Sequence, residues 1–558
     1  MAERPNLMPD RLRHGLLLLG LGLLTRAAAW LGDPAGGGAA NSACYQGDAP
    51  VWQRYAVDHA NDIEWLLPFR PPAMAWLSDA LSDGQSFWLL RALLVVLGAS
   101  LAPLCYLALR RIVAERVAVA AGAIVAVSSS LVQLGNGVHS EIPYLFLFAV
   151  SVGDLDRLRT APSALVAARW GLVQALASLL RTDHLAFVVL QLGWIAARRW
   201  RSWPRTLGIA IGTMVVALTP WQWHIAQQVA TANAEGFPGR LPKPLPLAGS
   251  LPWAPEALRA LDEVPAFARE MTFRFVDDTM KTRGAVRVTA ADLEVVREAY
   301  DAMPEPLATP LLVLYGPLNF FLGNAPESDG GFTRAALDRT PPLRGGPGAW
   351  PRGLAQVLPR GQGLVLEYPP HLAAVEHGYR LGLEWMSANP GSAASLIGNK
   401  LRLAWRGAAT GIGGYALPMG ASGERAPVDI TVADGAVATT WRFMLLTLAC
   451  LGAWRARRIA GVSPWLWWLV GKTAAIALFF GYARLGALCV PSLALLWALA
   501  LEPLLARLPR RAPWLLLAVV VACEVTRWIA APTATVTFPD ARPGMPPGPH
   551  DRAEVRFD

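Results

Sequence analysis

Long apolar segments separated by short polar turns make up most of this chain. Seven of them precede residue 227, at 15–31, 88–109, 113–135, 138–154, 161–180, 185–197 and 206–226, and four follow at 440–454, 464–481, 483–502 and 513–530. Each is close to the roughly 20 residues that a helix needs to cross a bilayer, or somewhat shorter. The pattern predicts an all-α polytopic membrane protein with about eleven transmembrane helices.

The long region 227–435 differs from the rest of the chain because it is rich in Pro and Gly and carries charges of both signs. We expect a large, mainly helical extracytoplasmic loop region here, with helical segments within 254–303 and 371–389. The run 308–322 is apolar but short and contains two prolines, so an interfacial or re-entrant segment is favoured over a transmembrane helix.

These patterns divide the chain into four regions. They are an N-terminal transmembrane module (1–226), whose first outer loop is 32–87, the loop domain (227–435), the C-terminal transmembrane helices (436–532) and a Pro/Gly-rich tail (533–558). We expect the tail to be disordered.

Arginines cluster in alternate turns between the apolar segments. The clusters are Arg110, Arg111 and Arg116; Arg157 and Arg159; Arg198, Arg199, Arg201 and Arg205; Arg455, Arg457 and Arg458; and Arg507, Arg510 and Arg511. The positive-inside rule then places the N-terminus in the cytoplasm and the loop 32–87 outside. Arg26 at the apolar end of the first segment favours a retained helix over a cleaved signal peptide. The Ala- and Arg-rich composition suggests a bacterial protein of the inner membrane.

Composition supports a membrane protein: 54% of the residues are hydrophobic, 16% are charged and 23 are Trp. The net charge of +9 reflects the turn arginines, so a nucleic-acid partner is not expected, whereas membrane lipids are. Five Cys and eight His form no disulfide framework or metal-ligand spacing, and no nucleotide-phosphate loop is present. We predict no metal site, although the acids leave a divalent cation as an open alternative.

With few His and Cys to support other chemistry, a carboxylate just outside the membrane is the best catalytic candidate. Asp48 lies in the first outer loop, in the stretch Gly47–Ala56. A carboxylate within about 3 Å of an attacking hydroxyl acts as a general base. The plainer alternative is a capping or solvated loop acid.

Several motifs carry a resemblance to a known family. Asp48 is followed by Tyr55 and by Arg70-Pro71-Pro72, and the stretch resembles the first outer loop of the GT-C superfamily, in the branch of protein O-mannosyltransferases and aminoarabinose transferases. The stretch 139–144, with Glu141, resembles the family's Ser/Thr-Glu-x-Pro element.

Three later stretches agree with this resemblance. Arg181-Thr182-Asp183 resembles the family's Arg-x-acid element, and Asn389-Pro390 with Lys400 is similar to the segment after the large loop. Arg484 with Pro491 matches the family's Arg-Tyr-x-x-Pro-x-x-Pro element in part, because the Tyr and the first Pro are missing.

The resemblance implies an inverting glycosyltransferase that moves a sugar from a polyprenyl-phosphate carrier to a hydroxyl of a lipid, glycan or protein at the outer face. Asp48 is then the base, and Arg181 and Arg484, with Lys400, are cations for the phosphate leaving group. Glu141 is either a second acid or the partner of an arginine. Tyr55 and Arg70 are further candidates for substrate binding.

Other interpretations stay open at this point. Arg181 is equally well explained as an ion-pair partner of Asp183, and Arg484 as a side chain that snorkels to the interface. Asp277-Asp278 is interpreted as surface charge. A transporter or flippase of lipid-linked saccharides is the alternative function, although the odd number of spans, the seven-plus-four split and the single large outer loop count against it. A non-catalytic scaffold is a third.

Overall fold

The computed structural model describes most of the helical part of the chain. The described residues are 10–31, 68–82, 88–197, 203–235, 251–263, 285–292, 309–333, 335–338, 369–409, 436–459, 461–509, 534–537 and 554–557, with Trp52 and a few isolated positions. They fall into two compact units, the first formed by 1–58, 71–220 and 398–558 and the second by 59–70 and 221–397. Each unit is described by itself. The boundaries expected at 226 and 435 stay predictions.

Unit 1 is a bundle of helices that follow the predicted apolar segments closely. Its elements are α1 (Asp10–Leu31), α4 (Ala73–Leu81), α5 (Trp88–Leu109), α6 (Glu115–Val127), α7 (Ser129–Asn136), α8 (Glu141–Thr160), α9 (Ala164–Leu180), α10 (His184–Ala197), the first half of α11 (Trp203–Glu235), the end of α19 (Pro390–Ala408), α20 (Ala436–Ala456), α21 (Ser463–Leu478), α22 (Ala483–Ala487) and α23 (Val490–Arg507). The helical fold class is as predicted.

Three of the described helices, α1, α5 and α23, are long and apolar enough to cross a membrane, and α6 with α7 makes a fourth if the bent pair is one span. These helices are those of an integral membrane protein. The total of eleven spans stays a prediction, and its last segment, 513–530, lies outside the continuously described residues.

The segment expected as one span at 113–135 is instead broken into α6 and α7, which are bent by 51°. Side chains of α1 bind the carbonyl groups at the break. Thr25 donates to the Ala126 carbonyl over 3.0 Å, and the Arg26 guanidinium donates to Ala126 and Leu131 over 3.3 and 3.4 Å. Backbone groups released inside a membrane helix need such partners.

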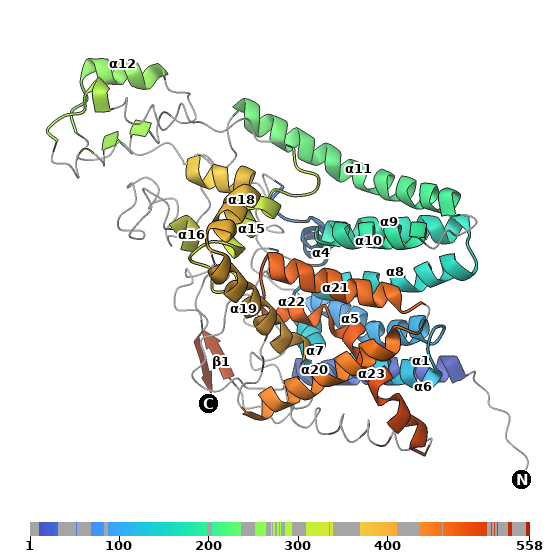
Figure 1. Ribbon diagram of the computed structural model, residues 1–558. Helices are drawn as coiled ribbons and strands as arrows, with labels where there is room; N and C mark the ends of the chain where they lie inside the picture. The colour runs from blue at the N-terminus through green and yellow to red at the C-terminus, as the bar shows by residue number, and fades with distance from the viewer. Residues whose placement is uncertain are drawn as a thin grey trace, which may run out of the picture. The chain divides into compact units, whose positions relative to one another are not determined.

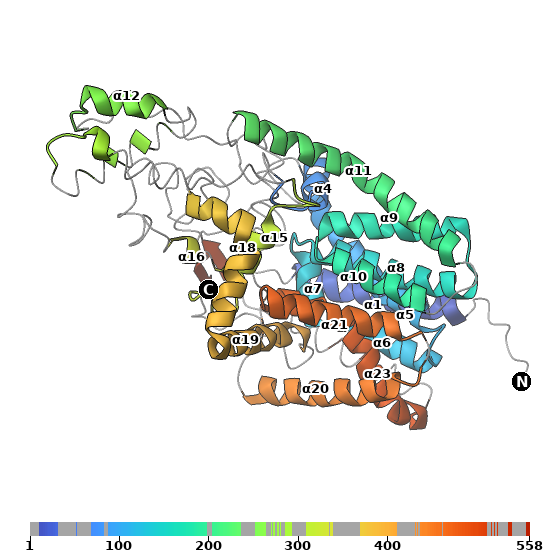
Figure 2. The same cartoon turned by 45° about the horizontal axis from the view of Figure 1, so that its top comes forward.

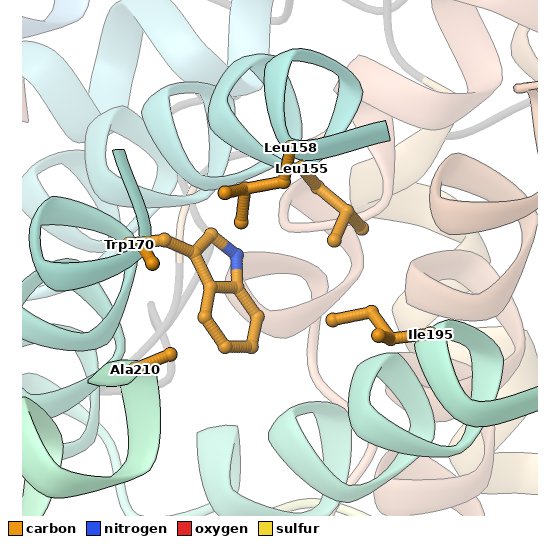
Figure 3. Close-up of a cluster of buried hydrophobic side chains, with 6 residues drawn as sticks. Leu155, Leu158, Trp170, Ile195 and Ala210 are labelled. Atoms are coloured by element: carbon orange, nitrogen blue, oxygen red, sulfur yellow. The ribbon is translucent and has the colours of Figure 1, made fainter. Parts of the chain in front are cut away.

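A buried apolar cluster joins α8, α9, α10 and α11 (Figure 3). Trp170 of α9 lies among Leu155 and Leu158 of α8, Ile195 of α10 and Ala210 of α11. Figures 1 and 2 show α8, α9 and α10 side by side within unit 1, with α21 next to α10. This packing holds the four helices together near the ends of α8 and α10 that lie away from the candidate site.

Unit 2 is built around the packing of α15 (Tyr315–Gly323) on α18 (Pro369–Ala388), with α12 (Pro255–Glu263) and α16 (Ala335–Asp338) as further helices. Gly378 and Gly382 of α18 permit this packing, because a Cβ at either would meet α15. The segment 308–322 contains the nine-residue α15, which is too short to cross a membrane. The helix expected at 371–389 is confirmed by α18.

Two details differ from the expectations for 227–435 and for the tail. Asp277 is buried rather than a surface charge, and it accepts a hydrogen bond from the Leu251 amide over 2.7 Å. In the tail, strands β1 (Ala534–Thr537) and β2 (Glu554–Phe557) pair antiparallel where disorder is expected. Alternating Val and Thr favour strand formation at β1.

Candidate functional site

Five charged side chains from distant parts of the chain meet in unit 1. Glu141 is the first residue of α8, Arg181 follows the end of α9, Asp183 precedes α10, Lys472 lies within α21 and Arg484 lies in α22. Three of the five are sequence-predicted site residues. We call these five residues the charged cluster.

Local sequence explains why helices end at the cluster. Helix α9 stops at Leu180, and the turn Arg181–Asp183 closes when the His184 amide donates to the Arg181 carbonyl over 3.1 Å. Helix α8 begins with Glu141, and Pro143 follows in its first turn, where a missing N–H costs nothing. An acid at this end is also favoured by the helix dipole.

Glu141 is shared by two arginines. Arg181 donates from Nη1 to the Oε1 atom of Glu141 over 3.1 Å, and the Nε atom of Arg484 lies 3.1 Å from the same oxygen. The Glu141 side chain has no exposed surface, and its Oε2 atom accepts no hydrogen bond from any described residue. One oxygen thus holds both arginines, while the other is open to a hydrogen-bond donor.

Asp183 is shared in the same way by Arg181 and Lys472. The Nε atom of Arg181 donates to Oδ1 over 3.3 Å, and Nζ of Lys472 donates to Oδ2 over 2.7 Å. Three cations therefore face two carboxylates, and the cluster carries one net positive charge. Arg181 and Asp183 are 18% and 25% exposed, against 5% for Arg484 and 4% for Lys472, so the cluster is open at Arg181 and Asp183.

Lys472 is a site residue that sequence reasoning missed. Its ammonium donates to the Tyr144 hydroxyl over 2.5 Å and lies 4.5 and 4.7 Å from the ring centroids of Tyr144 and Trp468. The signal was available, because Lys472 stands alone within the apolar segment 464–481. A charged residue inside a membrane segment is costly and usually functional.

The geometry answers two of the questions left open by the sequence. Glu141 is the partner of both Arg181 and Arg484, and Arg181 also pairs with Asp183. Arg484 is 4% exposed, so the interpretation as an interfacial, snorkelling side chain is wrong. Its guanidinium also lies near Tyr482, the aromatic neighbour that follows Gly481.

Lys400 lies in unit 1 but caps a helix. Its side chain is fully buried in α19, and Nζ donates to the Ala477 carbonyl over 3.4 Å, in the last turn of α21. A cation is favoured at this end of a helix. Close packing brings α19 there, because a Cβ at Gly481 would meet the backbone of Lys400.

Arg70 belongs to unit 2. Its guanidinium carbon lies 5.3 Å from the ring centroid of Tyr315, and the neighbouring Pro68 carbonyl accepts a hydrogen bond from the Leu314 amide over 2.8 Å. These contacts attach the end of the first loop to the start of α15. Asp48 and Tyr55 lie outside the described residues, and their roles stay predictions.

Charge decides what the cluster can bind. Among the described residues, no three His, Cys, Asp or Glu side chains form a group suited to a metal ion. Both carboxylates of the cluster are already paired with cations, whereas Mg²⁺ and Ca²⁺ need oxygen ligands free to bind them. The cluster does not fit a divalent cation, and its excess positive charge suits an anion.

Comparisons with known proteins give distant likenesses. No family model and no curated protein matches the chain. Among solved structures, it is similar to the archaeal oligosaccharyltransferase AglB from Archaeoglobus fulgidus in complex with an inhibitory peptide and a dolichol-phosphate, with a TM-score of 0.40 and 13% identity over 92% of this chain. The chain spans 56% of the length of that AglB chain.

The chain is also similar to ArnT from Cupriavidus metallidurans. The apo structure gives a TM-score of 0.31 with 13% identity over 87% of this chain and 76% of that chain. The structure bound to undecaprenyl phosphate gives 0.32 with 12% identity over 88% and 77%.

Proposed function

We propose that the protein is an inverting glycosyltransferase that moves a sugar from a polyprenyl-phosphate carrier to an acceptor hydroxyl at the outer face of the membrane. The observation that carries this proposal is the charged cluster, whose three cations exceed its two carboxylates and whose most exposed cation is Arg181. A buried cluster with surplus positive charge at helix ends suits the phosphate of a lipid.

The chemistry assigns a role to each group. The acceptor oxygen forms a bond to the anomeric carbon while its proton passes to Asp48, the proposed base. The bond from the anomeric carbon to the carrier phosphate breaks, and the phosphate leaves with the electron pair. Arg181, at the open side of the cluster, and the buried Arg484 stabilise the negative charge that develops on the phosphate.

Glu141 supports the departure of the phosphate in this proposal. Through Oε1 it holds Arg181 and Arg484 side by side. Because its side chain is fully buried, Glu141 acts through these two arginines and not by direct contact with the acceptor.

Sugar transfer by the purified protein in lipid nanodiscs tests the proposal. A panel of synthetic polyprenyl-phosphate sugars is offered to the wild type, to Asp48→Asn and to Asp58→Asn, a matched change in the same loop. We expect transfer or slow hydrolysis of one donor by the wild type and by Asp58→Asn. Loss of a base is expected to lower the rate of Asp48→Asn by about 10²- to 10⁴-fold.

Two outcomes would contradict the proposal. Equal activity of Asp48→Asn and wild type would remove Asp48 from the role of base. A donor that binds without turnover would favour the alternative of a transporter or flippase if the protein, reconstituted in liposomes, also moves that donor across the membrane.

A further inference from the structure

A chain of buried polar side chains lies behind the charged cluster, and the proposed chemistry does not use it. Starting from Lys472, it passes through the Tyr144 hydroxyl (2.5 Å), His184 Nδ1 (3.1 Å), His184 Nε2 to Gln174 Oε1 (2.7 Å) and Gln174 Nε2 to Ser151 Oγ (2.6 Å). All five side chains are buried, and they come from α8, α9, α10 and α21. Burying so many polar groups is costly unless each is satisfied.

The direction of every hydrogen bond in this chain follows from the charge on Lys472. An ammonium group only donates, so the Tyr144 oxygen accepts from Lys472. The Tyr144 hydroxyl has its own proton to donate, and His184 Nδ1 at 3.1 Å accepts it when that nitrogen is unprotonated. The remaining ring nitrogen, Nε2, carries the proton and donates to Gln174 Oε1.

Gln174 fixes the far end of the chain. Its amide nitrogen donates to Ser151, and its oxygen faces the histidine. The opposite amide orientation would force a proton onto Nδ1 of His184, and the Tyr144 hydroxyl would then meet donors on both sides. Because an amide does not pass on a proton, the chain serves to hold an arrangement rather than to conduct protons.

We propose that Gln174 and His184 are positioning residues, which act through Tyr144 to hold Lys472 as a charged donor to Asp183. The proposal deepens the function proposed above and rests on it for its link to carrier binding. By occupying Asp183, Lys472 leaves the charge of Arg181 less neutralised and available to the carrier phosphate. Neither positioning residue touches the substrate.

The groups that face the His184 ring determine how readily it takes up a second proton. Tyr144 faces it from α8, Gln174 from α9, Lys472 and Trp468 from α21, and Asp183 is its neighbour in sequence. The charge of Lys472 opposes a second proton on the ring, and that of Asp183 favours it. Replacing Gln174 by Glu adds a carboxylate of the same size at the hydrogen bond to Nε2 and shifts this balance towards the doubly protonated ring.

The first test is a spectrum that needs no activity. The protein is labelled with ¹⁵N in its histidine rings, and the His184 signals are assigned by difference from His184→Asn. We expect the neutral ring with the proton on Nε2 from pH 8 to 5.5. A ring with the proton on Nδ1, or one that titrates in this range in the wild type, would overturn the proposal.

The second test measures binding of a short polyprenyl phosphate in nanodiscs at pH 8 and 5.5, relative to wild type at the same pH because the ligand itself titrates. We expect Gln174→Glu to lose at least about tenfold more affinity than the wild type on acidification, since a doubly protonated His184 can no longer accept from Tyr144. In Tyr144→Phe the chain is cut, so adding Gln174→Glu should confer no pH dependence.

The matched control is Gln191→Glu. Gln191 of α10 is equally buried, and its amide nitrogen donates to the Ser151 hydroxyl of α8 over 3.4 Å. We expect this variant to lose stability without the pH-dependent loss of binding. Equal pH dependence in Gln191→Glu, or in the double variant Gln174→Glu with Tyr144→Phe, would show a general effect of buried charge and overturn the proposal.

Failure of the proposed function is distinguished from failure of this inference. If the wild type binds no carrier, the transferase proposal fails. The ring spectra and thermal stability then test whether Gln174 and His184 act through Tyr144. Gln174→Glu should then lose stability on acidification from pH 8 to 5.5, and the Tyr144→Phe background should abolish that pH dependence. A pH-independent Gln174→Glu would overturn the inference on either readout.

Discussion

The two ends of α8 carry the same kinds of residue in different surroundings. Glu141 begins the helix, and Asp154 and Asp156 lie near its other end, about 20 to 25 Å away at 1.5 Å per residue. At the second end the partner arginines are exposed: Arg159 by 31% and Arg169 by 45%. At the first end the partners of Glu141 are themselves largely buried.

This difference shows that burial, rather than the presence of an ion pair, marks the site. An exposed arginine that loses its acid turns to water, so such pairs contribute little. A buried arginine that loses its acid is left as an unpaired charge, which is far more costly. The arginines in the turns and those of the charged cluster look alike in sequence. Only the arginines of the charged cluster need their carboxylate partners for stability.

Removal of the two acids gives the largest expected contrast. Glu141→Ala leaves Arg181 and Arg484 close together without their shared carboxylate, and we expect a loss of about 3–5 kcal/mol of unfolding free energy. Asp156→Ala at the other end should cost about 1 kcal/mol or less. Reversible unfolding in mixed detergent measures both. Equal losses would mean that the two ends do not differ in the way described.

Removal of the cations sharpens the comparison at the level of function. Arg181→Gln takes away the most open cation of the cluster, and we expect sugar transfer to fall by about 10²- to 10³-fold. Arg159→Gln makes the same change at an arginine that is 31% exposed at the other end of α8, and it should leave transfer within about twofold of wild type. Initial rates with saturating acceptor give the comparison, and a matching loss in Arg159→Gln would speak against the site.

The same effect of burial can be tested on a single titratable group in unit 2, the neutral side chain of His371. Burial lowers the pKa of His371 to about 4, partly offset by its hydrogen bond to the Leu337 carbonyl. The unfolded chain takes up this proton near pH 6.5, so the contribution to stability is complete above that pH and is lost as pH falls towards 4. We expect His371→Asn to remove up to about 3 kcal/mol of this pH dependence.

Stability of the wild type and His371→Asn across pH 4 to 7 tests this expectation, with His377→Asn as the matched change one turn and a half further along α18. Parallel curves for wild type and His371→Asn would show that the buried ring does not cause the slope.

Close helix packing supports Arg484, and a small change there has the smallest expected effect. A Cβ at Gly486 would meet the Ala404 carbonyl of α19, so Gly486→Ala should cost about 1–3 kcal/mol and lower carrier binding with it. Gly208→Ala is the control, because a Cβ there meets nothing within 4 Å, and it should be neutral or stabilising by up to about 1 kcal/mol. Thermal unfolding of both variants tests this expectation. Equal shifts of the unfolding temperature in the two variants would contradict it.

The sequence by itself determined the class of the fold and most of the helices. Apolar segments of membrane length specify helices without reference to the rest of the chain, because backbone groups in lipid must bind one another. Pro390 indicated the end of α18, because a proline rarely continues a helix, whereas α19 was not predicted. The break between α6 and α7 was not predicted, since it depends on Thr25 and Arg26, about 100 residues away.

Only the tertiary structure decided how the charged residues are paired. Glu141, Arg181 and Arg484 were singled out as single positions, but their meeting at one oxygen depends on the packing of α8, α9 and α22. Lys472 was missed, because one lysine in an apolar segment does not reveal its partner 289 positions away. Local pattern fixes where helices form, whereas the pairing of buried charges is a long-range property that only packed side chains reveal.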